Sequence, residues 1–116
     1  MLKGVLDLCI LSLLRGGPLY GYAVVDALSG KGLDLVAEGT IYPLLTRMDK
    51  AGLVSSYRAP SPEGPPRKYY KITNQGEIAL SSGIAQWREL NAGVGAIFDG
   101  VPQHTLNEEA ARAADK

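Results

Sequence analysis

The sequence has little of the chemistry that builds metal or redox sites. Among its 116 residues there is one cysteine, Cys9, and one histidine, His104. A lone cysteine cannot form a disulfide within the chain, and Cys9 lies in an apolar run, which predicts a small core residue. A single histidine without a cluster of cysteines or acids at ligand spacing does not make a metal site. We therefore expect no metal, no cofactor and no intrachain disulfide.

Long hydrophobic runs and an excess of either charge are also missing. No segment approaches the roughly 18 apolar residues of a membrane helix, and no charged region precedes a cleavage site. A soluble, cytoplasmic protein is expected. Twelve cationic and twelve acidic side chains cancel, so no overall field draws the chain to nucleic acid. Residues 40–72, however, hold six cations and two acids, a local excess of four. That distribution matters more for nucleic-acid binding than the sum.

Enzyme motifs are absent as well. The run Gly93-Val94-Gly95 falls inside an expected helix and lacks the strand that precedes a phosphate-binding loop. No set of serine, histidine and acid is suggested by the sequence. We do not expect an enzyme.

The stretch from Glu38 to Leu53 predicts a short amphipathic helix. Pro43 lacks an N–H and fits only a first turn, so the helix should begin near Gly39 or Thr40, with a capping oxygen from Thr40. Gly52 suits the left-handed residue that ends a helix, after which Leu53 can pack back. One face should be buried, with Ile41, Leu44, Leu45 and Met48 at helical spacing. The opposite face carries Tyr42, Thr46, Arg47, Asp49 and Lys50.

Two helices are expected before this one. Residues 3–15 are nearly all apolar, and a helix apolar on most sides is buried on most sides, which suggests cover from a second chain. Residues 16–18 end it. The next helix opens at Leu19 and ends at residues 29–32, and residues 33–37 form a short connection with a bridge of extended structure. Two helices joined by a short turn, the second with a polar outer face, form a helix-turn-helix.

A hairpin is predicted directly after the helix-turn-helix. Residues 53–58 and 67–73 alternate and predict two strands. Four prolines fall in residues 59–66, which we expect to exclude regular structure there and to leave a stiff, solvent-facing tip. Tyr69 and Tyr70 should point to opposite faces, one to the core and the other outward. A hairpin in this place is a wing.

A long helix should follow from Thr73, its cap, to Phe98. At 1.5 Å per residue it would span about 37 Å, more than the small preceding body can cover. One face of this helix carries a seam of residues spaced alternately by four and three, which needs a partner and predicts a homodimer. The seam residues are Leu80, Ile84, Trp87, Asn91, Val94 and Phe98. Residues 103–116 are polar and alanine-rich, with a short helix possible at 106–114 and a disordered end.

These elements predict a mainly α fold with a small β-hairpin, a winged helix-turn-helix with a long C-terminal dimerisation helix. The expected domains are the DNA-binding domain at 1–73, the dimerisation helix at 74–99, and a partly disordered polar tail at 100–116.

Several motifs in order resemble the PadR family of bacterial transcription regulators. These are Gly17-Pro18-Leu19-Tyr20-Gly21-Tyr22, Glu38-Gly39-Thr40-Ile41-Tyr42-Pro43 with Arg47 and Met48, Gly52-Leu53, and Arg67-Lys68-Tyr69-Tyr70-Lys71-Ile72-Thr73 with Gly76. The similarity covers residues 2 to about 98, and the motifs occur in the family's order and at its spacing. It implies a winged helix-turn-helix, a dimer made by the last helix, and repression released by a small phenolic, a drug-like molecule or another signal. The short C-terminal region resembles the family's smaller branch.

The polar face of the helix at residues 38–53 is the candidate DNA surface. Threonine hydroxyls can hold phosphates, and tyrosine and arginine can reach base edges. The alternative is an ordinary solvated face. The residues concerned are Thr40, Tyr42, Thr46, Arg47 and Lys50. Glu38 is unusual at a DNA surface, and we interpret it as neutralising its own helix start or holding Arg47 or another cation.

The wing and the second helix supply further candidates. Arg67 and Lys68 follow the proline-rich tip and would lie along phosphates or in the minor groove, with Arg58 a weaker candidate. Tyr20 and Tyr22, near the start of the second helix, would contact backbone phosphate or instead pack between helices.

Trp87 lies on the expected dimer seam. In the drug-sensing members that the chain resembles, a tryptophan here pairs with its symmetry mate and sandwiches flat aromatic ligands. Asn91 stands where that branch can carry a carboxylate, which weakens the expectation of cationic ligands. Plain dimer core is the other interpretation of Trp87, and Asn91 can instead fix the register across the dyad.

The sequence therefore predicts a homodimeric regulator of transcription that binds double-stranded operator DNA, most simply a repressor released by a small effector, for which an aromatic molecule is one candidate. An activator fits the sequence equally. The alternative is a winged-helix interaction module that docks another protein through its long helix and does not bind DNA.

Overall fold

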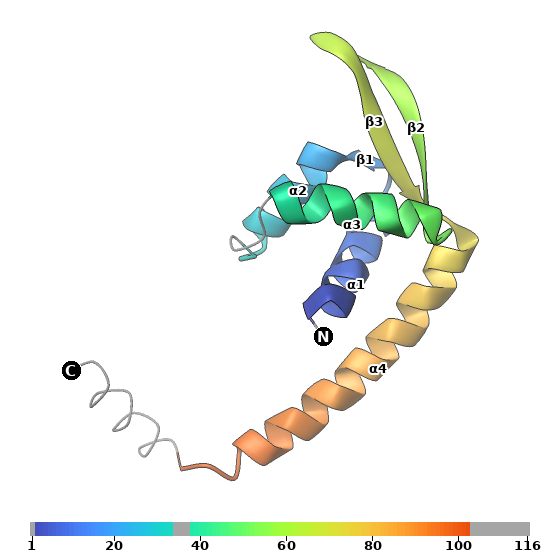
Figure 1. Ribbon diagram of the computed structural model, residues 1–116. Coiled ribbons are helices and arrows are strands. Elements are labelled where there is room, and N and C mark those ends of the chain that lie inside the picture. Colours follow the sequence, from blue (N-terminus) through green and yellow to red (C-terminus); the bar gives the residue numbers. More distant parts are fainter. Residues whose placement is uncertain (1, 34–37, 103–116) are drawn as a thin grey trace, which may run out of the picture. The chain divides into compact units, whose positions relative to one another are not determined.

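The computed structural model describes residues 2–33 and 38–102. In chain order, its elements are α1 (Leu2–Arg15), β1 (Leu19–Tyr20), α2 (Gly21–Gly30), α3 (Glu38–Lys50), β2 (Val54–Ser61), β3 (Gly64–Ile72) and α4 (Asn74–Phe98). Four helices and a three-stranded antiparallel sheet confirm the mainly helical winged fold (Figure 1). Some of the predicted features fall outside the described residues. These are most of the segment 33–37, where a bridge was expected, His104, and the tail at 103–116. The Glu38 side chain falls outside them as well.

The core of the first part of the chain is apolar and draws on every helix. Its largest fully buried side chains are Ile10, Leu11, Leu14, Val24, Ile41, Leu45, Met48 and Val54. The predicted stripe of α3 is confirmed, because Ile41, Leu45 and Met48 are fully buried and Leu44 is nearly so. The two neighbouring tyrosines point to opposite faces of β3, as predicted. Tyr70 joins the core, and Tyr69 on the other face is half-buried. Burial on one face thus leaves the other face of α3 available to solvent.

Helix α3 ends as predicted but begins earlier. Gly52 has a φ of 81°, and the N–H groups of Gly52 and Leu53 donate to the carbonyls of Asp49 and Met48, both at 3.0 Å. These bonds close the helix in a Schellman motif. The helix already starts at Glu38, so placing Thr40 at the cap and Pro43 in the first turn was wrong. Pro43 is tolerated because it lies on the exposed side, where the carbonyl left unpaired by its missing N–H is accessible to water.

A strand replaces the expected first turn of the second helix. Leu19 and Tyr20 form β1, paired with Tyr70 and Tyr69 of β3, and α2 begins only at Gly21. The sheet order is β1-β3-β2. A two-residue strand is too short to show a period of two, so the sequence pattern could not reveal it. The consequence is that the start of α2 is tied to the base of the wing.

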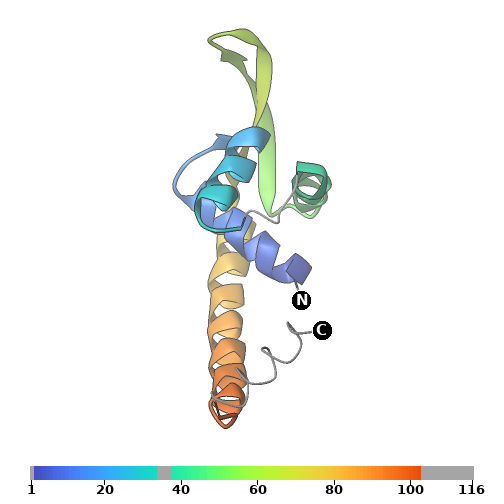
Figure 2. The ribbon, with the colours of Figure 1, turned by 90° about the vertical axis from the view of Figure 1, so that its left-hand side faces the viewer.

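The proline-rich segment is more regular than predicted. Strand β2 continues to Ser61 and β3 resumes at Gly64, so regular structure occupies most of the expected tip. Ala59 pairs with Arg67 and Ser61 with Gly64, which leaves Pro60 opposite two prolines at a register shift. Prolines fit strands at bulges and at edges, where no ladder N–H is required. The result is a ribbon that extends beyond the helices of this part of the chain (Figures 1 and 2).

Thr73 caps α4 as predicted. Its hydroxyl oxygen accepts a hydrogen bond from the Gly76 N–H at 3.0 Å, and its own hydroxyl lies 2.6 Å from the Gly52 carbonyl. One side chain therefore joins the end of α3 to the start of α4. The chain divides into two compact units, Met1–Ile84 and Ala85–Lys116, and α4 runs from one into the next. Within the described residues no helix is long and apolar enough to cross a membrane.

Candidate nucleic-acid interface

The outward face of α3 carries four of the predicted DNA-binding residues in exposed positions. Thr40, Tyr42, Thr46 and Lys50 are exposed, with Tyr42 at 41%. The Thr46 hydroxyl donates to the Tyr42 carbonyl at 3.1 Å, so it offers lone pairs and a methyl group outward. A hydroxyl oxygen and a methyl group can contact, respectively, a base donor and a thymine methyl. The face therefore combines one positive charge with groups able to read base edges.

Polar contacts hold α3 on both flanks of this face. Nη2 of Arg47 donates to both carboxylate oxygens of Asp7 in α1, at 2.8 and 3.0 Å. On the other flank, the Ser56 hydroxyl of β2 donates to Asp49 at 2.8 Å. Arg47, predicted as a DNA contact, thus also bridges two helices. Sequence spacing could not reveal this bridge, because its two residues lie 40 positions apart.

A hollow between the start of α2, the start of α3 and the wing brings together five predicted residues. Its lining is Tyr20, Gly21, Tyr22, Tyr42, Arg67, Lys68 and Tyr70. Two cations lie over its rings: the Arg67 guanidinium is 4.4 Å from the centre of the Tyr20 ring, and the Lys68 ammonium is 5.7 Å from that of Tyr70. Such contacts orient the cations without neutralising them. Sequence reasoning missed Gly21 and the role of Tyr70 here.

The outer face of the sheet carries a row of tyrosines. The Tyr69 ring stacks on Tyr57 and meets Tyr20 edge-on, with ring centres 5.7 Å apart in both pairs. Tyr57 and Tyr20 are the cross-strand partners of Tyr69 in β2 and β1. Cross-strand aromatic pairs stabilise a sheet. This row holds the three strands together at the base of the ribbon and so fixes the position of Arg67.

Burial perturbs two titratable groups of the first unit. It raises the pKa of the Tyr70 hydroxyl, with Asp49 and Tyr42 adding to the effect and Arg58 opposing it. It also raises the pKa of the Cys9 thiol, which agrees with the expected packing role rather than with a reactive thiolate. In residues 2–33 and 38–102, no group of three His, Cys, Asp or Glu side chains is placed to hold a metal ion.

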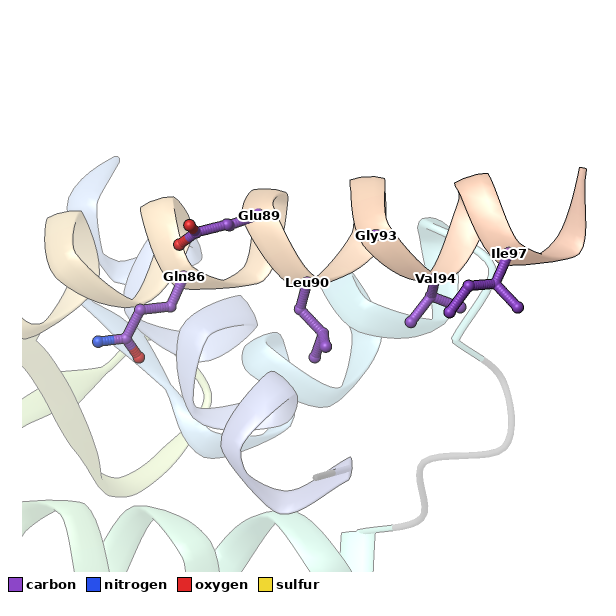
Figure 3. A pocket seen from close by; sticks show the side chains of 6 residues that line it. All are labelled: Gln86, Glu89, Leu90, Gly93, Val94 and Ile97. Carbon is purple, nitrogen blue, oxygen red and sulfur yellow. The ribbon is translucent and has the colours of Figure 1, made fainter.

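The second unit exposes an apolar helix face. A groove there is lined by Gln86, Glu89, Leu90, Gly93, Val94 and Ile97. Leu90, Val94 and Ile97 project from the same side of α4, with Gly93 between them (Figure 3). Trp87 and Asn91, the predicted ligand residues, are exposed beside this groove and do not line it. The sequence prediction did not include Leu90 and Ile97 in the apolar face. Positions 86, 90, 93 and 97 nevertheless show the same alternate spacing of four and three residues as the predicted seam.

A helix-turn-helix followed by a sheet with a protruding cationic ribbon defines a winged helix-turn-helix protein. The chain matches the PadR-like transcriptional regulator family over residues 10–82 and belongs to that family. The resemblance found in the sequence motifs is thereby confirmed. The chain is a PadR-family transcription regulator.

Solved structures of similar proteins agree. A PadR-like transcriptional regulator from Bacillus cereus is 40% identical, with a TM-score of 0.78 over 87% of this chain and 98% of that one. A PadR-like transcription factor from Bacteroides fragilis is 45% identical, with a TM-score of 0.71 over 82% and 91%. PadR from Bacillus subtilis, in complex with operator DNA, is 26% identical, with a TM-score of 0.64 over 69% of this chain and 46% of that one.

Proposed function

We propose that this chain forms a homodimer that binds operator DNA and represses transcription until an effector releases it. The observation that carries the DNA-binding proposal is the exposed polar face of α3 beside the cationic hollow at the wing base. The operator complex of Bacillus subtilis PadR supports it by analogy. Two recognition helices related by a dyad would enter successive major grooves about 34 Å apart.

The proposed DNA face has two parts. The exposed side chains of α3 read base edges, while the tyrosines and cations of the hollow hold phosphates. The residues assigned to it are Thr40, Tyr42, Thr46, Arg47, Lys50, Arg67, Lys68, Tyr20 and Tyr22. Zero net charge is compatible with this assignment because four cations gather here.

The proposed dimer interface is the second half of α4. On the groove side of the helix, Leu90 is 41% exposed and Ile97 73%, and Phe98, about 100° further round, is 67% exposed. A soluble helix rarely leaves so much apolar surface uncovered. A second copy of the same helix is the partner that a two-fold regulator supplies. The proposed domains stay a DNA-binding domain at 1–73, a dimerisation helix at 74–99 and a tail at 100–116. Leu80, predicted for the dimer seam, is instead buried in the core of the first unit, so the first half of α4 packs within its own chain.

The proposed effector site lies at Trp87 and Asn91, near the dyad. Trp87 is 40% exposed, so its ring is available either to a flat aromatic ligand or to its symmetry mate. A ligand that favours one dimer geometry would change the spacing of the recognition helices and release the DNA. Quenching of Trp87 fluorescence by aromatic compounds would support this site, and no quenching across a broad panel would favour plain dimer core.

The DNA-binding proposal is tested by band shift and fluorescence anisotropy with the duplex upstream of the protein's own coding sequence and a pool of random duplexes. Lys50→Ala combined with Lys68→Ala should weaken binding and lower the slope of log affinity against log salt by about two. Lys31→Ala, an exposed cation outside the face, is the matched control. Wild-type protein that selects no duplex from the pool would instead support the interaction-module alternative.

The dimer is tested by light scattering after chromatography. Ile97→Asp should convert the dimer to a monomer, because it places a charge in an apolar helix interface. Ala92→Asp, exposed and turned about 140° away from Ile97 around the same helix, is the control and should leave the dimer intact. A wild-type monomer at micromolar concentration would refute the proposal.

A further inference from the structure

The two polar contacts of α3 lie on opposite sides of its proposed DNA-reading face. Arg47 and Asp49 are two residues apart, which places them about 200° apart around the helix axis. Thr46 and Lys50 lie between them on the outward side, and the buried side chains lie between them on the inward side. The helix is therefore held by α1 on one flank and by β2 on the other.

The contacts add something that the core cannot. The inward face consists of apolar side chains, whose packing is favourable over a range of small rotations because the hydrophobic effect is not directional. Hydrogen bonds are directional, and the Arg47 and Ser56 contacts are 2.8 Å long. Two such contacts on opposite flanks fix the rotation of the helix about its own axis.

Arg47 is held in a particular way. Its Nη2 donates to Asp7, and its Nε is buried with no hydrogen-bond partner among the described residues. The Asp7 side chain is 19% exposed and that of Arg47 41%. The Arg47 side chain is thus partly exposed, while its guanidinium is held by Asp7 of α1.

Electrostatic attraction to DNA does not explain the placement of Asp7 and Asp49. A carboxylate beside a DNA-binding face repels phosphates and lowers affinity. Asp7 and Asp49 nevertheless lie at the two edges of this face. Each accepts a hydrogen bond from another element, which gives it a structural task at that place.

We propose that Asp7 and Asp49 are positioning residues for operator recognition, which set the rotation of α3 and so select the side chains that face the base pairs. This inference rests on the proposed function. It assigns specificity to two acids that need not touch DNA.

The experiment compares two probes: the duplex that wild-type protein selects most strongly from a random pool, and a scrambled duplex of equal length. Asp7→Ala should lower affinity for the selected duplex by about tenfold, the size of one lost base contact. Affinity for the scrambled duplex should stay equal or rise, because a negative charge has been removed. Electrostatics alone predicts tighter binding to both probes.

The contact on the other flank separates the hydrogen bond from the charge. Ser56→Ala removes the bond to Asp49 with no change in charge and should lower the ratio of selected to scrambled affinity severalfold. Asp49→Asn keeps an oxygen that accepts the Ser56 bond and removes the charge, so it should keep or raise affinity for both probes. Asp7→Glu retains a carboxylate for Arg47 and should restore most of the ratio lost in Asp7→Ala.

The outcomes are distinct. Wild-type ratios in both Asp7→Ala and Ser56→Ala would overturn the inference, and so would an equal loss on both probes, since that reports loss of the fold or of the whole face. Glu63→Gln removes an exposed acid that lies in the ribbon turn and is the charge control. Failure of the wild-type protein to select any duplex would instead refute the proposed function itself.

Discussion

The ring of Tyr42 occupies the space that a side chain at position 21 would need. A Cβ built on Gly21 would overlap Cε1 of Tyr42, so the glycine makes room for the Tyr42 ring against the first turn of α2. Both residues line the hollow that also holds Arg67 and Lys68. The backbone at position 21 therefore determines where an exposed tyrosine of the proposed DNA face lies.

Gly21→Ala should weaken DNA binding more than it weakens the fold. The methyl group would displace the Tyr42 ring, which is partly exposed and can rotate away, so the free energy of unfolding should change by less than about 1 kcal/mol. Binding to the selected duplex should fall severalfold by anisotropy. Gly30→Ala, at the other end of the same helix with open space around it, is the control and should bind normally. Unchanged binding in Gly21→Ala would mean that the position of Tyr42 does not matter for DNA.

Two glycines of α4 should respond in opposite ways to alanine. A Cβ on Gly76 would overlap the Leu53 carbonyl oxygen, a backbone atom that cannot turn aside, whereas one on Gly93 meets nothing within 4 Å. Gly76→Ala should destabilise the protein by about 2 kcal/mol or more. Gly93 lines the groove of the proposed dimer interface, so its variant is compared in the monomeric Ile97→Asp background. There Gly93→Ala should stabilise the helix by up to about 1 kcal/mol. Urea unfolding measures both, and similar values for the two variants would contradict the described packing.

The Thr73 hydroxyl should contribute measurably to stability. It caps α4 and contacts the Gly52 carbonyl at the end of α3, so Thr73→Ala should cost about 1–2 kcal/mol in urea unfolding. Thr73→Ser retains the hydroxyl and should recover most of that loss. If both variants unfold alike, the cap is not the source of the effect.

Tyr70 should make the protein less stable at alkaline pH. Because burial raises its pKa, the folded protein holds the phenolic proton more tightly than the unfolded chain does. The resulting stabilisation is fully present below the unfolded tyrosine pKa of about 10 and is lost as the pH rises through the folded value. Tyr70→Phe should flatten the fall in unfolding free energy between about pH 9 and 11.

Features that depend on a local sequence pattern could be predicted from the sequence. The buried stripe of α3, its glycine end and the Thr73 cap each depend on residues close together in the chain, and all three were confirmed. The β1 strand, the contact between Asp7 and Arg47 and the approach of Gly21 to Tyr42 depend on residues far apart, so no local pattern reveals them. The prolines were misjudged because their effect depends on whether a strand lies at an edge.

The short β1 strand and the proline-bearing ribbon together limit how this sheet can grow. Strand β1 covers one edge of β3 at Tyr69 and Tyr70. On the side of β1 toward the ribbon tip, β3 carries Arg67 and the two prolines Pro65 and Pro66. The outer strand β2 carries Pro60 and Arg58. Prolines cannot donate to an added strand, and cations on an open edge disfavour its approach. The protein can thus extend an unpartnered ribbon into solvent at high concentration with little risk of forming intermolecular sheets or fibres.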